Sequence, residues 1–162
     1  MDYPDVTFVL QVGLTDKEQY THRLGRTARA GKGGAGMLLL MDFEKKHMLH
    51  ILHGMPLETL TTESLDLEKY RAVCQAGVDK MLRNTEGRKA AEQGYGAWLG
   101  FYNGNKKNCG GWNNTMLVEA ANHFACTLGF PRGEPPALEK KTVGKMGLKG
   151  VAGLRLAVSS YR

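Results

Sequence analysis

Two short apolar runs near the start of the chain set its first predicted elements. Residues 6–13 (VTFVLQVG) and 35–41 (AGMLLLM) have the length of strands. Apolar residues on both faces of the first run indicate a strand that is buried in a parallel sheet. Between the runs, Thr15 or Asp16 can cap a short helix that ends near Leu24. The pattern therefore predicts one strand–helix–strand unit with parallel strands.

Beyond residue 41 the pattern becomes helical. We expect Asp42 to cap a helix that runs to about His53, and the polar stretch 61–64 to mark a boundary. Apolar positions at helical spacing then predict helices only. The expected ranges are 67–82, 88–102, 115–128 and a last short helix within 135–145.

The predicted sheet is too small to be stable alone. A parallel pair of strands buries little surface and leaves both edges unpaired. We therefore expect residues 1–55 to be half of an α/β domain whose other strands lie before Met1.

Charge is distributed unevenly along the 162 residues. The net charge is +6, but residues 1–64 carry 7 basic and 8 acidic side chains, whereas residues 131–162 carry 7 and 2. A basic C-terminal segment suits phosphate backbones, because neutralising phosphates releases condensed counterions. A merely soluble basic tail is the alternative.

The cysteines and the hydropathy of the chain limit the kinds of protein to which it can belong. Three cysteines without a CxxC pair indicate neither a disulfide framework nor a zinc site, and favour a reducing, intracellular compartment. No stretch approaches the roughly 20 apolar residues of a membrane span, so we predict no membrane partner. The acidic residues after Met1 lead into an apolar strand pattern and resemble neither a secretory signal nor an Arg-rich transit peptide, so we expect either a cytosolic protein or a true N-terminus that lies before Met1. A mitochondrial location of a longer parent protein stays open.

The chemistry is concentrated between the two predicted strands. Arg23, Arg26 and Arg29 follow one another at three-residue spacing, which in a helix would place them roughly on one side. We expect residues 25–36 to form a loop instead, in which Gly25 permits a sharp bend. Guanidinium groups bind phosphate oxygens in a bidentate manner. Taken alone, the cluster fits a phosphate clamp or a solvated basic face.

The complete motif resembles a known family. His22-Arg23-Leu24-Gly25-Arg26-Thr27-Ala28-Arg29 matches the HRxGRxxR motif of DEAD-box ATP-dependent RNA helicases at every fixed position. The resemblance implies a partial RecA-like α/β domain (one βαβ unit plus a helix), followed by an all-α helical extension and a basic tail. Residues 1–60 would form the C-terminal half of the second RecA-like domain, 61–130 the extension, and 131–162 the Gly/Lys-rich tail.

The resemblance also implies roles for individual residues. Arg26 and Arg29 would be catalytic arginine fingers on the γ-phosphate of ATP bound with Mg²⁺. Asp2, which resembles the last residue of the preceding family motif, would contact the ribose. His22, Arg23 and Gly25 would couple the nucleotide to the interface with the N-terminal RecA-like domain, which would hold most of the ATP and Mg²⁺.

A narrower resemblance covers the rest of the chain. Residues 65–150 are similar to the helical extension of fungal, mitochondrial-type DEAD-box helicases, which helps to bend RNA. Four lysines are the expected RNA-binding residues: Lys140, Lys141, Lys145 and Lys149. Trp112, in a loop beside two lysines, is a further candidate for stacking on a base, whereas Trp98, Phe101 and Tyr102 have the spacing of core residues.

The other sequence motifs do not indicate a second nucleotide-binding or metal-binding site. No GxxxxGK[ST] and no Asp-Glu-Ala-Asp sequence occurs, so we expect this polypeptide alone to lack ATPase activity. Residues 31–36 match GxGxxG but precede a strand, which is the wrong context for a dinucleotide site. His47, His50 and His53 splay around a helix and lack a fourth ligand, so we predict no metal site. Two alternatives remain: an ATP-independent RNA-binding module, or a truncated gene product without function.

Overall fold

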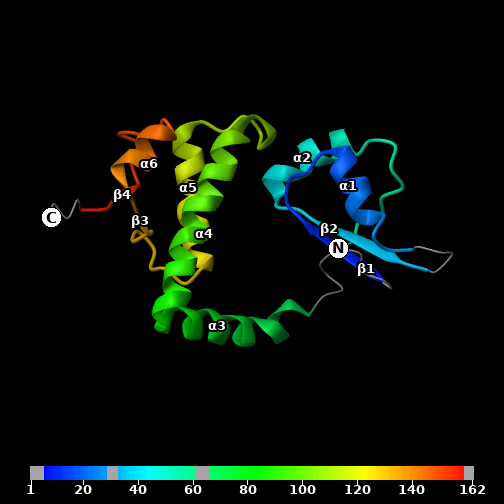
Figure 1. Ribbon diagram of the computed structural model, residues 1–162, viewed down its shortest axis with the longest axis horizontal. Coiled ribbons are helices and arrows are strands. Elements are labelled where there is room, and N and C mark those ends of the chain that lie inside the picture. Colours follow the sequence, from blue (N-terminus) through cyan, green and yellow to red (C-terminus); the bar gives the residue numbers. More distant parts are fainter. Residues whose placement is uncertain (1–5, 29–32, 61–65, 159–162) are drawn as a thin grey trace. The chain divides into compact units, whose positions relative to one another are not determined.

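The computed structural model describes residues 6–28, 33–60 and 66–158, which divide into two compact units. The N-terminal unit comprises residues 1–58 with 108–110, and the C-terminal unit comprises 59–107 and 111–162. Figure 1 shows the helices and strands of both units.

The N-terminal unit contains the predicted strand–helix–strand element. Strand β1 (Phe8–Val12) pairs in parallel with β2 (Ala35–Leu39), and α1 (Lys17–Leu24) connects them. Helix α2 (Asp42–Ile51) follows. Both helices pack against one face of the strands, around a core of Tyr20, Met48 and Leu52. The mixed α/β architecture is compatible with part of a RecA-like domain.

The prediction that the first strand is buried on both faces was wrong for the described residues. Phe8, Leu10 and Val12 are 50%, 54% and 67% exposed, and Leu39 on the paired strand is 56% exposed. Only the opposite face is covered, because α1 and α2 lie on the same side of the sheet (Figure 1). One side of this sheet is therefore an uncovered apolar surface.

Local side-chain bonds set where the helices of this unit begin. Asp16, not Thr15, caps α1, and its carboxylate accepts from the Gln19 backbone N–H at 2.7 Å. The expectation that Asp42 caps α2 was wrong by one residue, because the N-cap position is Met41. The buried Glu44 carboxylate accepts from the Met41 N–H at 2.8 Å and from the Leu14 N–H at 3.1 Å. Glu44 thus ties the start of α2 to the end of β1.

The C-terminal unit is built around two long helices. Helix α4 (Thr85–Gly104) and α5 (Asn114–Thr127) lie side by side, α3 (Leu67–Arg83) packs on α4, and the short η3 (Lys106–Asn108) follows α4 (Figure 1). Apolar residues of α4 and α5 recur at three- and four-residue spacing, which gives each helix one buried stripe. The buried residues are Ala91, Tyr95, Leu99, Tyr102, Leu117, Val118, Ala121 and Ala125.

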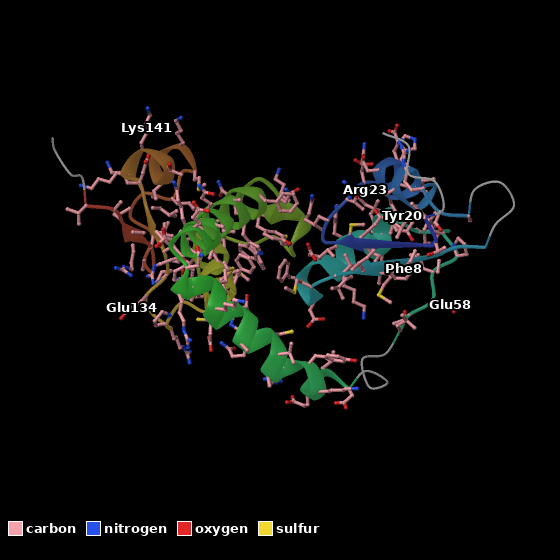
Figure 2. All side chains as sticks on the ribbon, turned by 60° about the horizontal axis from the view of Figure 1, so that its bottom comes forward. Phe8, Tyr20, Arg23, Glu58, Glu134 and Lys141 are labelled. Atoms are coloured by element: carbon pink, nitrogen blue, oxygen red, sulfur yellow. The ribbon has the colours of Figure 1, made fainter. Side chains whose placement is uncertain are left out.

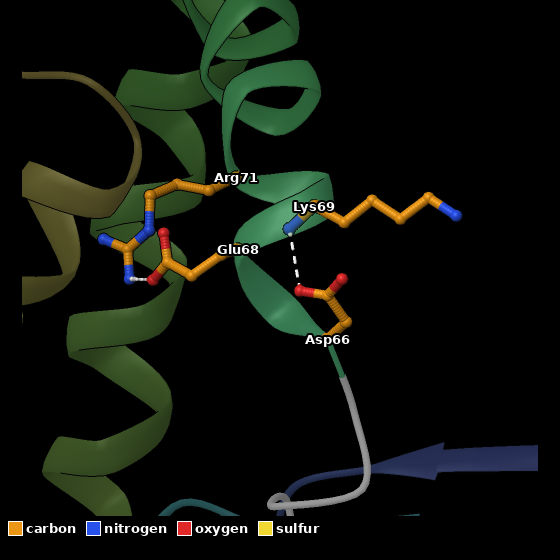
Figure 3. A network of polar contacts seen from close by, with 4 residues as sticks. All are labelled: Asp66, Glu68, Lys69 and Arg71. Atoms are coloured by element: carbon orange, nitrogen blue, oxygen red, sulfur yellow. Dashed lines mark hydrogen bonds and ion pairs between the residues drawn. The ribbon is translucent and has the colours of Figure 1, made fainter.

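Helix α3 begins with a local polar network. The Asp66 carboxylate accepts from the Lys69 backbone N–H at 3.3 Å, and Arg71 and Glu68 form an ion pair at 2.8 Å (Figure 3). None of its residues is buried. Its C-terminal half packs where the chain turns after α5: Gly129 has φ +89°, and a Cβ there would lie 2.6 Å from Val78 Cγ1. Position 129 therefore requires glycine.

The segment predicted as a basic tail has a fixed fold in its described part. Strand β3 (Ala137–Leu138), α6 (Lys140–Lys145) and β4 (Arg155–Leu156) form a small parallel ββ element with a helix between the strands. Two side chains of the long helices hold its turns: the Asn103 amide donates to Met146 O, and the Asn122 amide donates to Gly153 O, both at 2.9 Å. Leu148 is completely buried. Such side-chain-to-backbone bonds leave no periodic pattern in the sequence, which explains the difference.

Candidate nucleotide and RNA contacts

The arginine-rich motif occupies the end of α1 and the turn after it. His22 and Arg23 lie in the last helical turn, where positive charge is favoured by the helix dipole. Both are exposed, whereas Tyr20 on the same helix is buried (Figure 2). Because α1 ends at Leu24, as predicted, Arg26 lies in the turn after the helix.

Thr27 fixes the turn that presents Arg26. The Thr27 hydroxyl donates to Val6 O at 2.6 Å, and the two residues form a parallel bridge beside the sheet. Thr27 is 6% exposed, whereas Arg26 is exposed. The guanidinium of Arg26 is thus attached to an anchored backbone and directed to the surface. No local sequence pattern indicates this role of Thr27, because its partner lies 21 residues earlier.

The sharp bend expected at Gly25 is absent. Its φ is −66°, a value open to any residue, so it does not provide a glycine-specific bend. A Cβ at this position would lie 3.3 Å from Thr21 O, which is a close contact. Among the described residues of the motif, Ala28 has a positive φ, at 57°. Arg29 and Asp2 lie outside the described residues, so their predicted roles stay predictions.

The donors of the motif fit an anion and not a cation. Arg23 and Arg26 offer fixed positive charge and N–H donors, which suit phosphate oxygens. Within residues 6–28, 33–60 and 66–158, no three His, Cys, Asp or Glu side chains gather as a metal site. The motif can therefore contact the phosphates of a nucleotide, whereas Mg²⁺ needs oxygen ligands from elsewhere.

The four predicted RNA-binding lysines are all exposed and lie around α6. Lys140, Lys141 and Lys145 belong to the helix, and Lys149 follows it. Figure 2 shows Lys141 pointing into solvent. Lys140 and Lys149 line one groove. The fold therefore brings Lys140 and Lys149, nine positions apart in the sequence, to the same groove.

The aromatic residues pack mainly on one another. The Trp98 ring stacks on Phe124 with centroids 5.2 Å apart and lies 4.3 Å from Tyr102. Trp112 joins this cluster, 6.1 Å from Tyr102, so its ring is engaged in packing. Phe101 is the exception to the predicted core set, since it is 47% exposed.

Among the titratable groups of the C-terminal unit, Tyr95 is strongly perturbed. Burial raises the pKa of its hydroxyl to about 12, because the charged form would lose its hydration. The hydroxyl donates to Asn122 Oδ1 at 3.0 Å. Asn122 also holds the turn at Gly153, so Tyr95 supports the element that carries the lysines.

Within the part of the chain that the structure describes, no helix is long and apolar enough to cross a bilayer.

The curated proteins to which this chain is similar are DEAD-box ATP-dependent RNA helicases. The chain is 43% identical to the probable DEAD-box ATP-dependent RNA helicase 48 of Arabidopsis thaliana, over 95% of its own length and 18% of that protein. It is 46% identical to DEAD-box ATP-dependent RNA helicase 31 of the same plant, over 96% of the chain and 20% of that protein. Helicase 31 of Oryza sativa subsp. japonica is 43% identical, over 96% and 26%. No family model matches the chain, and no solved structure matches it.

The relatives support the resemblance to DEAD-box helicases in general, and not the narrower resemblance to one subfamily of them. They are plant helicases, so the proposed likeness to the fungal mitochondrial-type subfamily is not supported. The chain spans about a fifth to a quarter of the length of the curated relatives cited here. Along nearly its whole length, this chain is homologous to a segment of the DEAD-box ATP-dependent RNA helicases.

Proposed function

We propose that the chain forms part of an ATP-dependent RNA helicase, in which Arg26 and Arg29 act as arginine fingers. The observation that carries the proposal is the exposed Arg26 on a turn anchored by Thr27, inside a motif that matches HRxGRxxR. A guanidinium on an anchored backbone has fewer conformations to lose when it meets a phosphate, and it stabilises charge that develops in phosphoryl transfer. His22 and Arg23 then couple the nucleotide to the partner domain, and Asp2 contacts the ribose.

The uncovered sheet face supports a larger assembly. Phe8, Leu10 and Val12 present apolar side chains to water, at a cost of roughly 25 cal/mol per Å² relative to burial. We propose that the remaining strands of a RecA-like domain and the N-terminal RecA-like domain complete this unit and hold ATP with Mg²⁺. The present polypeptide by itself then lacks ATPase and unwinding activity.

We further propose that the lysines around α6 bind the RNA backbone. Each lysine that neutralises a phosphate adds about 0.7 to 0.9 to the slope of log affinity against log salt. The alternative function, an RNA-binding module that works without ATP, is favoured by the separate core of the C-terminal unit. The two functions differ in whether nucleotide alters RNA affinity.

The test is an exchange of segments. The chain replaces the homologous segment of Arabidopsis helicase 31, and RNA-stimulated ATP hydrolysis is measured for the chimaera. Arg26→Ala is expected to reduce kcat about 10³-fold or more. Lys45→Ala on the exposed surface of α2 is the matched control and leaves kcat unchanged. Full activity of the Arg26→Ala chimaera would contradict the arginine-finger role. If nucleotide does not change the RNA affinity of the chimaera, the ATP-independent RNA-binding module is favoured.

A further inference from the structure

The C-terminal unit contains a groove whose apolar lining none of the proposed roles uses. The groove has a volume of about 410 Å³, and all its lining residues lie within residues 140–156. This volume lies within the range of about 300–1,000 Å³ that small-ligand sites occupy. Its apolar lining consists of Val143, Leu148, Val151, Leu154 and Leu156.

The groove has a fixed floor and an open wall. Val143 and Leu148 are 3% and 0% exposed, so they belong to the packed interior. Leu156 on β4 is 47% exposed and keeps an aliphatic side chain in water. An apolar group that enters the groove would cover Leu156 and gain the free energy of removing both surfaces from water.

Positive charge surrounds this apolar surface. Lys140 and Lys149 are themselves lining residues, and both are exposed. Between residues 139 and 156 there are five basic side chains and one acidic side chain, Glu139. A ligand that places carboxylates on either side of an apolar group matches both the floor and the rim.

The lining discriminates between a nucleobase and an apolar side chain. Base recognition ordinarily uses aromatic faces or guanidinium planes, with hydrogen bonds to the base edges. The groove is lined by aliphatic side chains, and its polar side chains are the two lysines. A base placed there would find the lysine N–H donors but no aromatic or guanidinium plane to stack on. A leucine or phenylalanine side chain needs no such plane.

We propose that the groove between α6 and β4 binds an acidic peptide segment with a bulky apolar anchor. The anchor lies on the accessible lining residues Val151, Leu154 and Leu156, above the buried Val143 and Leu148, and flanking carboxylates pair with Lys140 and Lys149. The site goes beyond the ATP and RNA roles proposed above, but it shares two lysines with the RNA surface. Peptide and RNA therefore compete for this face.

The first test measures binding of a fluorescein-labelled peptide, Asp-Glu-Leu-Phe-Glu-Asp, to the full chain by fluorescence anisotropy. A matched peptide with Ser-Ser in place of Leu-Phe is expected to bind at least about tenfold more weakly. In methyl NMR spectra, the first peptide is expected to shift the resonances of the five apolar lining residues. Equal affinity for the two peptides, or shifts elsewhere only, would overturn the proposal.

Substitutions at residues that line the groove test whether the peptide binds there. Leu156→Asp is expected to weaken peptide binding about tenfold, and Lys149→Gln about threefold. Lys89→Gln, at an exposed position of α4 outside the groove, is the control and changes nothing. Lys149→Gln keeps the test valid even if Leu156→Asp lowers the melting temperature, because Lys149 is a surface residue.

A second ligand separates this proposal from the RNA proposal. Oligouridylate binding is expected to weaken in Lys145→Gln and to persist in Leu156→Asp, whereas peptide binding shows the reverse pattern. Loss of both ligands in Leu156→Asp, with the fold intact, would assign the groove to RNA and overturn the peptide proposal. Absence of any RNA binding would end the RNA proposal and leave the peptide site standing.

Discussion

The two units of this chain bury their apolar surface to different extents. In the C-terminal unit, α4 and α5 face one another and the ββ element covers their side, so side chains such as Tyr95, Leu99 and Leu117 are fully buried. In the N-terminal unit, two helices cover one face of a sheet and leave the other face apolar and exposed. The difference indicates that the first unit is built to pack against further structure. The second unit encloses a core along α4 and α5 and leaves Leu67, Tyr70 and Val73 of α3 exposed.

The comparison extends to how polar groups are used. The N-terminal unit buries the Glu44 carboxylate, which accepts two backbone N–H groups at the junction of β1 and α2. The C-terminal unit uses neutral amides, Asn103 and Asn122, which donate to backbone carbonyls. A buried charge is costly unless it is well paired, so the smaller core of the first unit depends more on one residue.

The largest expected effect is in the core along α4 and α5. Leu99→Ala removes a fully buried side chain of α4 and is expected to lower the free energy of unfolding by about 2–5 kcal/mol. Leu10→Ala on the exposed sheet face is the matched change and is expected to cost less than about 0.5 kcal/mol. Urea denaturation of both variants measures the difference. Equal losses would mean that the sheet face is covered in solution.

A smaller effect is expected at the buried carboxylate. Glu44→Ala leaves the N–H groups of Met41 and Leu14 without their acceptor and is expected to cost about 1–3 kcal/mol. Glu44→Gln retains one oxygen acceptor and should lose less. Thermal melting followed by NMR at the buried Tyr20 of the N-terminal unit reports the change locally. A neutral outcome for Glu44→Ala would show that water replaces the carboxylate.

The smallest effect at neutral pH concerns Tyr95. Because its folded-state pKa is raised from 10.0 to about 12, the folded chain retains a proton that the unfolded chain loses. Its contribution to stability is therefore fully present below pH 10 and declines as pH rises toward 12, by at most about 1.4 kcal/mol per pH unit.

Tyr95→Phe removes that dependence. The variant is expected to lose about 1 kcal/mol at neutral pH, from the bond to Asn122, and to show a flatter decline than the parent chain above pH 10. Denaturant titrations at a series of pH values compare the two chains. Parallel curves for parent and variant would mean that Tyr95 titrates normally and is not desolvated.

Local patterns in the sequence determined much of what the structure contains. The strand-length runs give β1 and β2 in parallel, and apolar spacing gives α3, α4 and α5 close to their expected ranges. These features depend on residues a few positions apart, whose effects repeat along the chain. The fixed positions of HRxGRxxR also led to the helicase resemblance that the homologues support.

Tertiary structure alone decided three other features. The one-sided burial of the sheet depends on which face α1 and α2 cover, and apolar residues on both faces of β1 did not reveal it. The anchored turn at Arg26 depends on a bond from Thr27 to Val6. The folded basic segment, with Lys140 and Lys149 on one groove, depends on Asn103 and Asn122. Each arises from contacts between residues distant in sequence, which local periodicity does not encode.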